Sequence, residues 1–148
     1  MHTVQTINKI LVRSNFIDVD FNNNIYIGFN YYEMPFRGYR VLKTSDLGMT
    51  WQTLIDFSVP GASGWYPQIN DMLVAGTDLT NLRVFLGLSG PGNGGPQVLG
   101  AIKIFDGNTG TELPNSIILG DFMTFGVRDI ALCSDYRHPL SSSNPYSA

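Results

Sequence analysis

Apolar and polar side chains alternate with a period of two in short runs along this chain, and turn-forming residues separate the runs. Such alternation is typical of strands that bury one face of a sheet, whereas a helix repeats its apolar residues about every 3.6 positions. Residues 16–21 show the pattern clearly, and three asparagines at 22–24 then predict a tight hairpin, because asparagine tolerates a left-handed backbone. One face of that strand carries Ile17, Val19 and Phe21, and the other carries Asp18 and Asp20. The pattern predicts an all-β chain of antiparallel strands.

The composition also favours strands joined by short turns. Charged residues make up only 14% of the chain, and 16 glycines and 8 prolines are present. Ten of the twelve acidic residues are aspartate, which favours turns, whereas glutamate favours helices. The net charge is −3 and no basic cluster occurs, so no nucleic-acid partner is expected, because phosphate binding needs clustered cations. No apolar run is long enough to span a bilayer.

The predicted strands fall into units of four. The strands expected in the first unit are 16–21, 25–29, 39–43 and 51–57, with a loop at 31–38. Those expected in the second unit are 66–75, 82–88, 97–105 and 116–119, and 127–133 opens a third unit. The repeat spans about 50 residues from Phe16 to Tyr66 and about 60 from Tyr66 to Val127. Four strands per unit at such a period is typical of propeller blades, and the alternative is a meander sandwich with accidental spacing.

The turn after the third strand of the first unit carries a recognisable motif, Thr44-Ser45-Asp46-Leu47-Gly48-Met49-Thr50-Trp51. It matches the pattern Ser/Thr-x-Asp-x-Gly-x-Thr-Trp at all five defining positions and resembles the Asp-box of bacterial neuraminidase (sialidase) repeats. In such a turn Asp46 can accept backbone hydrogen bonds, Gly48 can supply a positive φ and Thr50 can add a hydroxyl bond. Trp51 is expected to place its ring between layers.

This resemblance implies a fold and not an enzyme, because in sialidase-like propellers the turn is structural and lies away from the active site. It implies an incomplete sialidase-like β-propeller built of antiparallel four-stranded blades. The predicted boundaries are about 14–58 for blade one and about 65–120 for blade two, then a first strand of a third blade at about 127–134 and a polar tail at 135–148. A weaker copy of the motif follows Phe105, in which Asn108 takes the place of Gly48 and the tryptophan is missing.

No catalytic, cofactor-binding or metal-binding constellation is predicted. Alternating oxygen-bearing side chains occur at Asp18, Asp20, Asn22 and Asn24. A calcium loop would need a glutamate at the twelfth position counted from Asp18, where Phe29 stands, so a polar hairpin is favoured. The glycine-rich sequence SGPGNGGP at 89–96 precedes a predicted strand, whereas a phosphate-binding loop needs a following helix. Sialidase chemistry would need an arginine triad and a nucleophilic pair drawn from several blades, so this chain alone is not expected to be an enzyme.

One face of the predicted blades has a composition that suits binding. The loops that join the second and third strands should lie on the same face as the connections between blades. That face would carry Tyr31, Tyr32, Glu33, Arg37, Trp65 and Tyr66. Aromatic rings beside an arginine and a glutamate suit contact with a glycan or a protein, and the alternative is that these rings pack between blades.

Three functional hypotheses follow. The first is a non-catalytic propeller segment of a larger secreted or cell-surface protein, acting as a scaffold or as a glycan- or protein-binding module. Its partners would be the remaining blades of that parent or other copies of itself. The second is a fragment of a sialidase-like glycoside hydrolase whose catalytic residues lie outside this chain. The third is a stand-alone small β protein that assembles by association of blades. The expected setting is extracellular or at the cell surface, although no signal peptide is visible in the chain.

Overall fold

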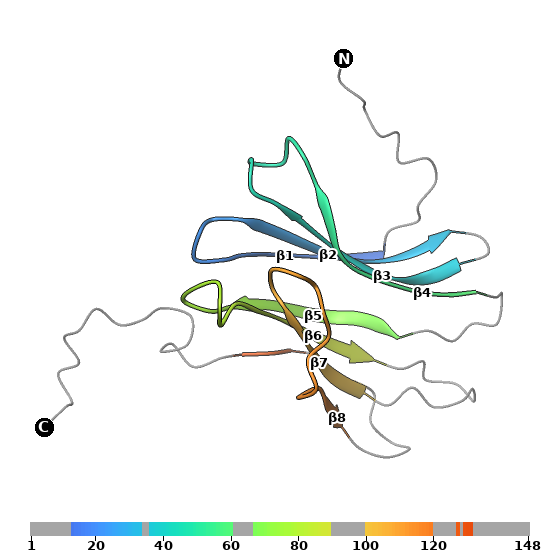
Figure 1. Ribbon diagram of the computed structural model, residues 1–148. Helices are drawn as coiled ribbons and strands as arrows, with labels where there is room; N and C mark the ends of the chain where they lie inside the picture. The colour runs from blue at the N-terminus through green and yellow to red at the C-terminus, as the bar shows by residue number, and fades with distance from the viewer. Residues whose placement is uncertain are drawn as a thin grey trace, which may run out of the picture.

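A computed structural model describes residues 13–33, 36–60, 67–89, 100–119, 127 and 129–131. Its strands are β1 (Arg13–Val19), β2 (Ile25–Glu33), β3 (Phe36–Thr44), β4 (Gln52–Pro60), β5 (Gln68–Ala75), β6 (Arg83–Ser89), β7 (Gly100–Asp106) and β8 (Ile117–Leu119). They form two antiparallel sheets of four strands, in the orders β1-β2-β3-β4 and β5-β6-β7-β8. We call these the first sheet and the second sheet, and Figure 1 shows them stacked face to face. The prediction of an all-β antiparallel fold is confirmed. Among the described residues no helix could cross a membrane.

The hairpin between β2 and β3 is longer than the sequence pattern indicated. The loop predicted at 31–38 is wrong, because β2 continues to Glu33 and β3 begins at Phe36. Within this hairpin Tyr31 is paired with Gly38, and Tyr32 is paired with Arg37. Aromatic residues favour strands because their rings pack well on a pleated surface, and here they extend the pairing to the end of the hairpin.

The hydrophobic core lies between the two sheets. The largest fully buried side chains are Tyr26, Tyr39 and Val41 of the first sheet, and Ile69, Val84, Leu86 and Leu88 of the second sheet with Leu82 of its β5–β6 turn. The ring of Tyr39 stacks on Phe57 of the neighbouring strand, with ring centroids 5.0 Å apart. Removing this apolar surface from water is the main favourable contribution to the packing of one sheet on the other.

Strand β1 keeps the predicted alternation, but its polar side faces the interior. Ile17, Val19 and Phe21 are 69%, 52% and 40% exposed, whereas Asp20 is buried. Asp18 accepts a hydrogen bond from the backbone N–H of Val74 in the second sheet, at 2.7 Å. Aspartates on this side are tolerated because each one is hydrogen-bonded.

The segment that follows the second sheet packs on the sheet's far side. Val127 is buried, and its backbone N–H donates to the carbonyl of Leu88 at 3.2 Å. The side-chain amide of Asn70 donates to the carbonyl of Val127 at 2.9 Å. Gly87 faces this segment, since a Cβ there would lie 2.7 Å from Cγ1 of Val127. None of the described residues of this segment forms a strand, so the strand predicted at 127–133 is not seen in them.

Candidate functional site

The turn between β3 and β4 is closed by the side chains of the Asp-box motif. Asp46 Oδ1 accepts hydrogen bonds from the hydroxyl of Thr44 at 2.7 Å and from the backbone N–H of Thr50 at 2.8 Å. Asp46 Oδ2 accepts the hydroxyl of Thr50 at 2.5 Å. Thr44 Oγ1 in turn accepts the backbone N–H of Gly48 at 3.0 Å. The positive φ predicted at Gly48 is confirmed at 91°, and Leu47 also has a positive φ of 58°.

The donors around Asp46 stabilise its ionised form. They lower its pKa from 3.8 to about 2, mainly through the hydroxyl of Thr50 and then through the backbone N–H of Thr50. A carboxylate held in this way is a poor proton donor or acceptor near neutral pH. The turn therefore has the electrostatics of a structural element and not of a general acid or base.

Trp51 does not lie between layers, which corrects the prediction. Its side chain is 40% exposed, and it stands in the turn directly before β4. The ring packs beside Gly48, where a Cβ would lie 3.5 Å from Cζ2 of the indole. The space between the sheets is already filled by side chains of the strands themselves, so the ring remains at the end of the sheet.

The weaker copy of the motif is also an aspartate-capped turn, between β7 and β8. Asp106 Oδ1 accepts the backbone N–H groups of Asn108 and Thr109, both at 2.9 Å. The hydrogen bond from the Thr109 N–H is the largest cause of the lowered pKa of Asp106. A positive φ occurs in this turn at Gly110, at 71°. Gly110 is required there because a Cβ would collide with the carbonyl oxygen of Leu54 in the first sheet.

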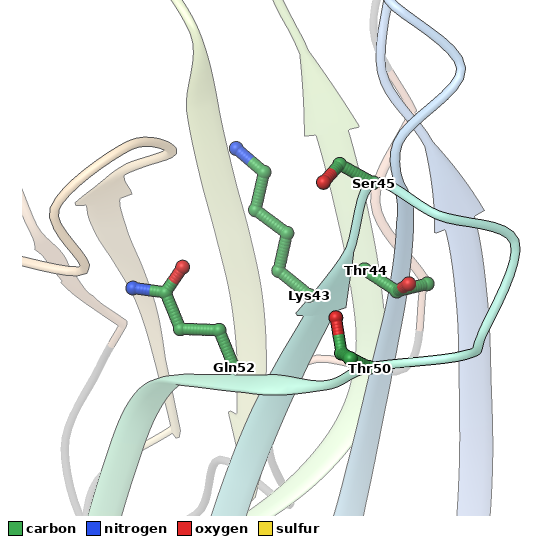
Figure 2. A pocket seen from close by; sticks show the side chains of 5 residues that line it. All are labelled: Lys43, Thr44, Ser45, Thr50 and Gln52. Carbon is green, nitrogen blue, oxygen red and sulfur yellow. The ribbon is translucent and has the colours of Figure 1, made fainter.

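A small polar pocket of about 130 Å³ lies beside the Asp-box turn. Figure 2 shows the residues that line it, which are Lys43, Thr44, Ser45, Thr50 and Gln52. Lys43 already donates to the carbonyl of Gly107 at 3.2 Å and lies over the ring of Tyr26, 5.1 Å from its centroid. The hydroxyls of Thr44 and Thr50 bind Asp46. The two threonines of the pocket therefore stabilise the Asp-box turn, and Lys43 is engaged by the turn that follows β7.

Asp20 organises the hairpin between β1 and β2, a role that sequence reasoning missed. Its Oδ1 accepts the backbone N–H groups of Asn22 and Asn24, both at 2.9 Å. Its Oδ2 accepts the side-chain amide of Asn24 at 2.7 Å and the hydroxyl of Tyr26 at 3.1 Å. Burial, followed by the charge of Asp20, raises the pKa of Tyr26. The predicted tight hairpin is confirmed, with Asn23 at φ 62°.

These donors engage both carboxylate oxygens of Asp20. No group of three or more potential metal ligands occurs among the described residues.

The predicted binding face is only partly assembled by the described residues. The guanidinium of Arg37 lies 4.4 Å from the centroid of the Tyr32 ring, and Arg37 Nε is buried without a hydrogen-bond partner in the described part of the chain. Glu33 lies at the end of β2, but its side chain is outside the described residues, as are Trp65 and Tyr66.

Tyr31 is buried, which corrects its placement on an accessible face. Its exposed fraction is 3%, its hydroxyl donates to Asp56 Oδ1 at 3.1 Å, and the guanidinium of Arg40 covers its ring at 4.9 Å. Burial is the largest cause of its raised pKa. Tyr31 therefore supports the sheet and does not offer its ring to a ligand.

Asn30 joins the two sheets, and no signal in the sequence indicated it. Its side chain is buried, donates to the carbonyl of Ile69 at 2.8 Å and accepts the N–H of Ile69, also at 2.8 Å. An asparagine in an apolar strand can join two sheets only when a strand of the other sheet places an unpaired backbone N–H and carbonyl beside its side chain.

Comparisons of the chain with family models, with curated proteins and with solved structures find no match.

Proposed function

We propose that this chain is a non-catalytic segment of a β-propeller-type repeat protein, which serves as a scaffold and carries a binding site for a glycan or protein. Three features support the repeat architecture. Two consecutive four-stranded meanders stack face to face, each has an aspartate-capped turn after its third strand, and a third segment packs on the second sheet. The Asp-box resemblance favours a secreted or cell-surface parent, whose other blades would be partners of this chain.

The binding part of the proposal rests on one observation, the stacked pair of Arg37 and Tyr32. A guanidinium packed on an aromatic ring is held in one plane, so that its free edge can meet a carboxylate or hydroxyl with little loss of conformational entropy. Arg37 Nε is buried and has no hydrogen-bond partner among the described residues, so the described part of the fold does not use this donor. No comparable unsatisfied side-chain donor is found elsewhere in the described part of the chain.

A glycan array and a peptide array probed with the full chain test this function. Arg37→Ala should weaken binding about tenfold or more, because a hydrogen bond to a charged group contributes about 1.5–3 kcal/mol. Arg83→Ala is the matched control: it removes the same charge at the other end of the sheets, where Arg83 lies 3.7 Å from Asp106. Circular dichroism should show that both variants keep the β fold. Equal binding by wild type and Arg37→Ala, or no binding to either array, would contradict the binding role.

A further inference from the structure

The Asp-box turn presents large apolar side chains to solvent. Leu47 and Met49 are 86% and 83% exposed, and Trp51 at the end of the turn is 40% exposed. Figure 1 shows the turn between β3 and β4 projecting from the first sheet. Single exposed apolar residues are common on protein surfaces, whereas three of them within five residues form a patch that needs an explanation.

The fold gains little from the side chains at the tip of this turn. The second sheet packs on a face of the first sheet, and this stacking leaves Leu47 and Met49 uncovered. Leu47 also has a positive φ of 58°, a conformation that glycine and asparagine adopt readily and that leucine adopts at a cost. The turn therefore keeps a leucine where a small or polar residue would be less strained. Local strain that the fold does not use points to a role outside folding.

The backbone of the turn is suited to an apolar environment, because three consecutive N–H groups are bonded within the turn. Gly48 N–H donates to Thr44 Oγ1 at 3.0 Å. The N–H groups of Met49 and Thr50 donate to the carbonyl and to the carboxylate of Asp46, at 3.4 Å and 2.8 Å. Backbone groups without partners oppose entry into lipid, where no water can bond them. The same bonds fix the turn before binding, so that little conformational entropy is lost when its apolar side chains are buried.

The order of the apolar side chains matches the layers of a bilayer interface. Leu47 and Met49 lie at the exposed tip, whereas Trp51 lies nearer the sheet, directly before β4. Aliphatic side chains favour the edge of the hydrocarbon region, and indole rings favour the level of the headgroups, where the ring is buried and its N–H stays wet. A projecting tip of this kind enters lipid without the shape-complementary pocket that a protein partner would have to supply.

The charges near the turn decide which headgroups it can meet. Residues 47–55 contain no charged side chain. The carboxylate of Asp46 is held by Thr44 and Thr50 at the base of the turn, and Lys43 already donates to the carbonyl of Gly107. Attraction to anionic lipids needs clustered basic residues, which this turn lacks. Zwitterionic headgroups are therefore favoured over anionic ones.

We propose that the Asp-box turn is a peripheral membrane contact, which inserts Leu47 and Met49 into the interface of a bilayer with choline headgroups and leaves Trp51 at headgroup level. The attachment is weak and reversible, because so few side chains enter the lipid. Arg37 lies at the opposite end of β3, so this contact is separate from the binding site of the proposed function.

Flotation of the full chain with phosphatidylcholine vesicles tests the contact. Wild type should float with the vesicles in proportion to lipid concentration, and its tryptophan emission should shift to shorter wavelength. Leu47→Asn combined with Met49→Ser should lower the partition coefficient about tenfold or more, because both aliphatic side chains are removed. Leu79→Ser is the matched control, since Leu79 is 56% exposed and is the one exposed large apolar residue of the β5–β6 turn. This control should float like wild type.

Thermal melts separate a membrane contact from a structural role. Asparagine accepts the left-handed backbone at position 47, so the double variant should have a Tm equal to or above that of wild type. A lower Tm would show that these side chains serve the fold and would overturn the proposal. So would a wild-type chain that stays free of phosphatidylcholine vesicles, equal flotation of the double variant, or binding only to vesicles that contain anionic phosphatidylglycerol. Self-association without flotation, lost in the double variant, would assign the turn to a protein contact and would reject the lipid.

Discussion

At the scale of single residues, aspartate side chains close the turns of this protein. Asp46, Asp78 and Asp106 each accept backbone N–H groups of the residues that follow them. Hydrogen bonds from Thr50, Thr80 and Thr109, respectively, are the largest causes of their lowered pKa values. Aspartate suits this task because its short side chain reaches the backbone of its own turn, whereas glutamate is one methylene too long. The excess of aspartate over glutamate in the sequence follows from this role.

The lowered pKa of Asp46 predicts a stability change in acid. Its folded-state pKa of about 2 lies below the ordinary value of 3.8, so ionised Asp46 stabilises the fold fully above about pH 4. That contribution is lost as the pH falls toward about 2. Thermal melts at stepped pH should show that Asp46→Asn has a lower Tm than wild type at neutral pH, and that the difference shrinks in acid. A difference independent of pH would show that the charge of Asp46 does not stabilise the turn.

At the scale of elements, each sheet is a meander of hairpins whose register depends on close backbone packing. Gly38 of β3 is paired with Tyr31 on one side and with Ser58 on the other. A Cβ at Gly38 would collide with the carbonyl oxygen of Phe57 in β4. The absence of a side chain at this position therefore allows β3 and β4 to pair along their length.

Gly38→Ala should destabilise the first sheet strongly, because rigid backbone atoms of β4 would have to move. We expect a loss of about 1–3 kcal/mol or more in the free energy of unfolding, measured by urea denaturation. Gly28→Ala is the matched comparison, and its cost should be smaller because the nearest atom is the flexible thioether of Met72. Equal costs for the two substitutions would indicate that the backbone approach at Gly38 is not tight.

At the scale of the whole molecule, a few polar side chains align the two sheets across an otherwise apolar interface. Asn30 satisfies both backbone groups of Ile69, and Tyr26 donates to the carbonyl of Gly107 at 3.1 Å. Apolar burial is non-directional and would permit many relative positions of the sheets. Buried hydrogen bonds restrict those positions, because a shifted arrangement would leave polar groups without partners.

Asn30→Ala should destabilise the protein by about 2–4 kcal/mol, since it leaves the N–H and the carbonyl of Ile69 buried without partners. Amide exchange at Ile69 should accelerate more than exchange within β7, which is separated from β5 by β6 in the sheet order. Asn115→Ala removes an exposed asparagine in the turn before β8 and should change the free energy of unfolding little. Unchanged exchange at Ile69 in Asn30→Ala would show that the sheets are held by apolar contacts alone.

The sequence by itself determined the strands and most of the turns, because both depend on local chemistry. Alternation specified where chain segments extend, and Asn23, Asp46 and Gly48 specified turns through interactions within a few residues. Prediction was weakest where the local sequence fits both a loop and a strand, as at 31–38. There the aromatic residues extend the pairing of β2 with β3 beyond the predicted ends of the two strands.

Only the tertiary structure decided which side of each strand is buried. A period of two divides β1 into two faces but does not say which face meets a neighbour. The face of Asp18 is covered because Val74 supplies an unpaired N–H, while Ile17 remains 69% exposed. Trp51 was expected to be buried and is 40% exposed, whereas Tyr31 was expected on an accessible face and is 3% exposed. The reason is the same for both, because the packing space and the hydrogen-bond partners of each ring come from other strands. Local sequence encodes conformation, but burial depends on what residues distant in the chain bring to each surface.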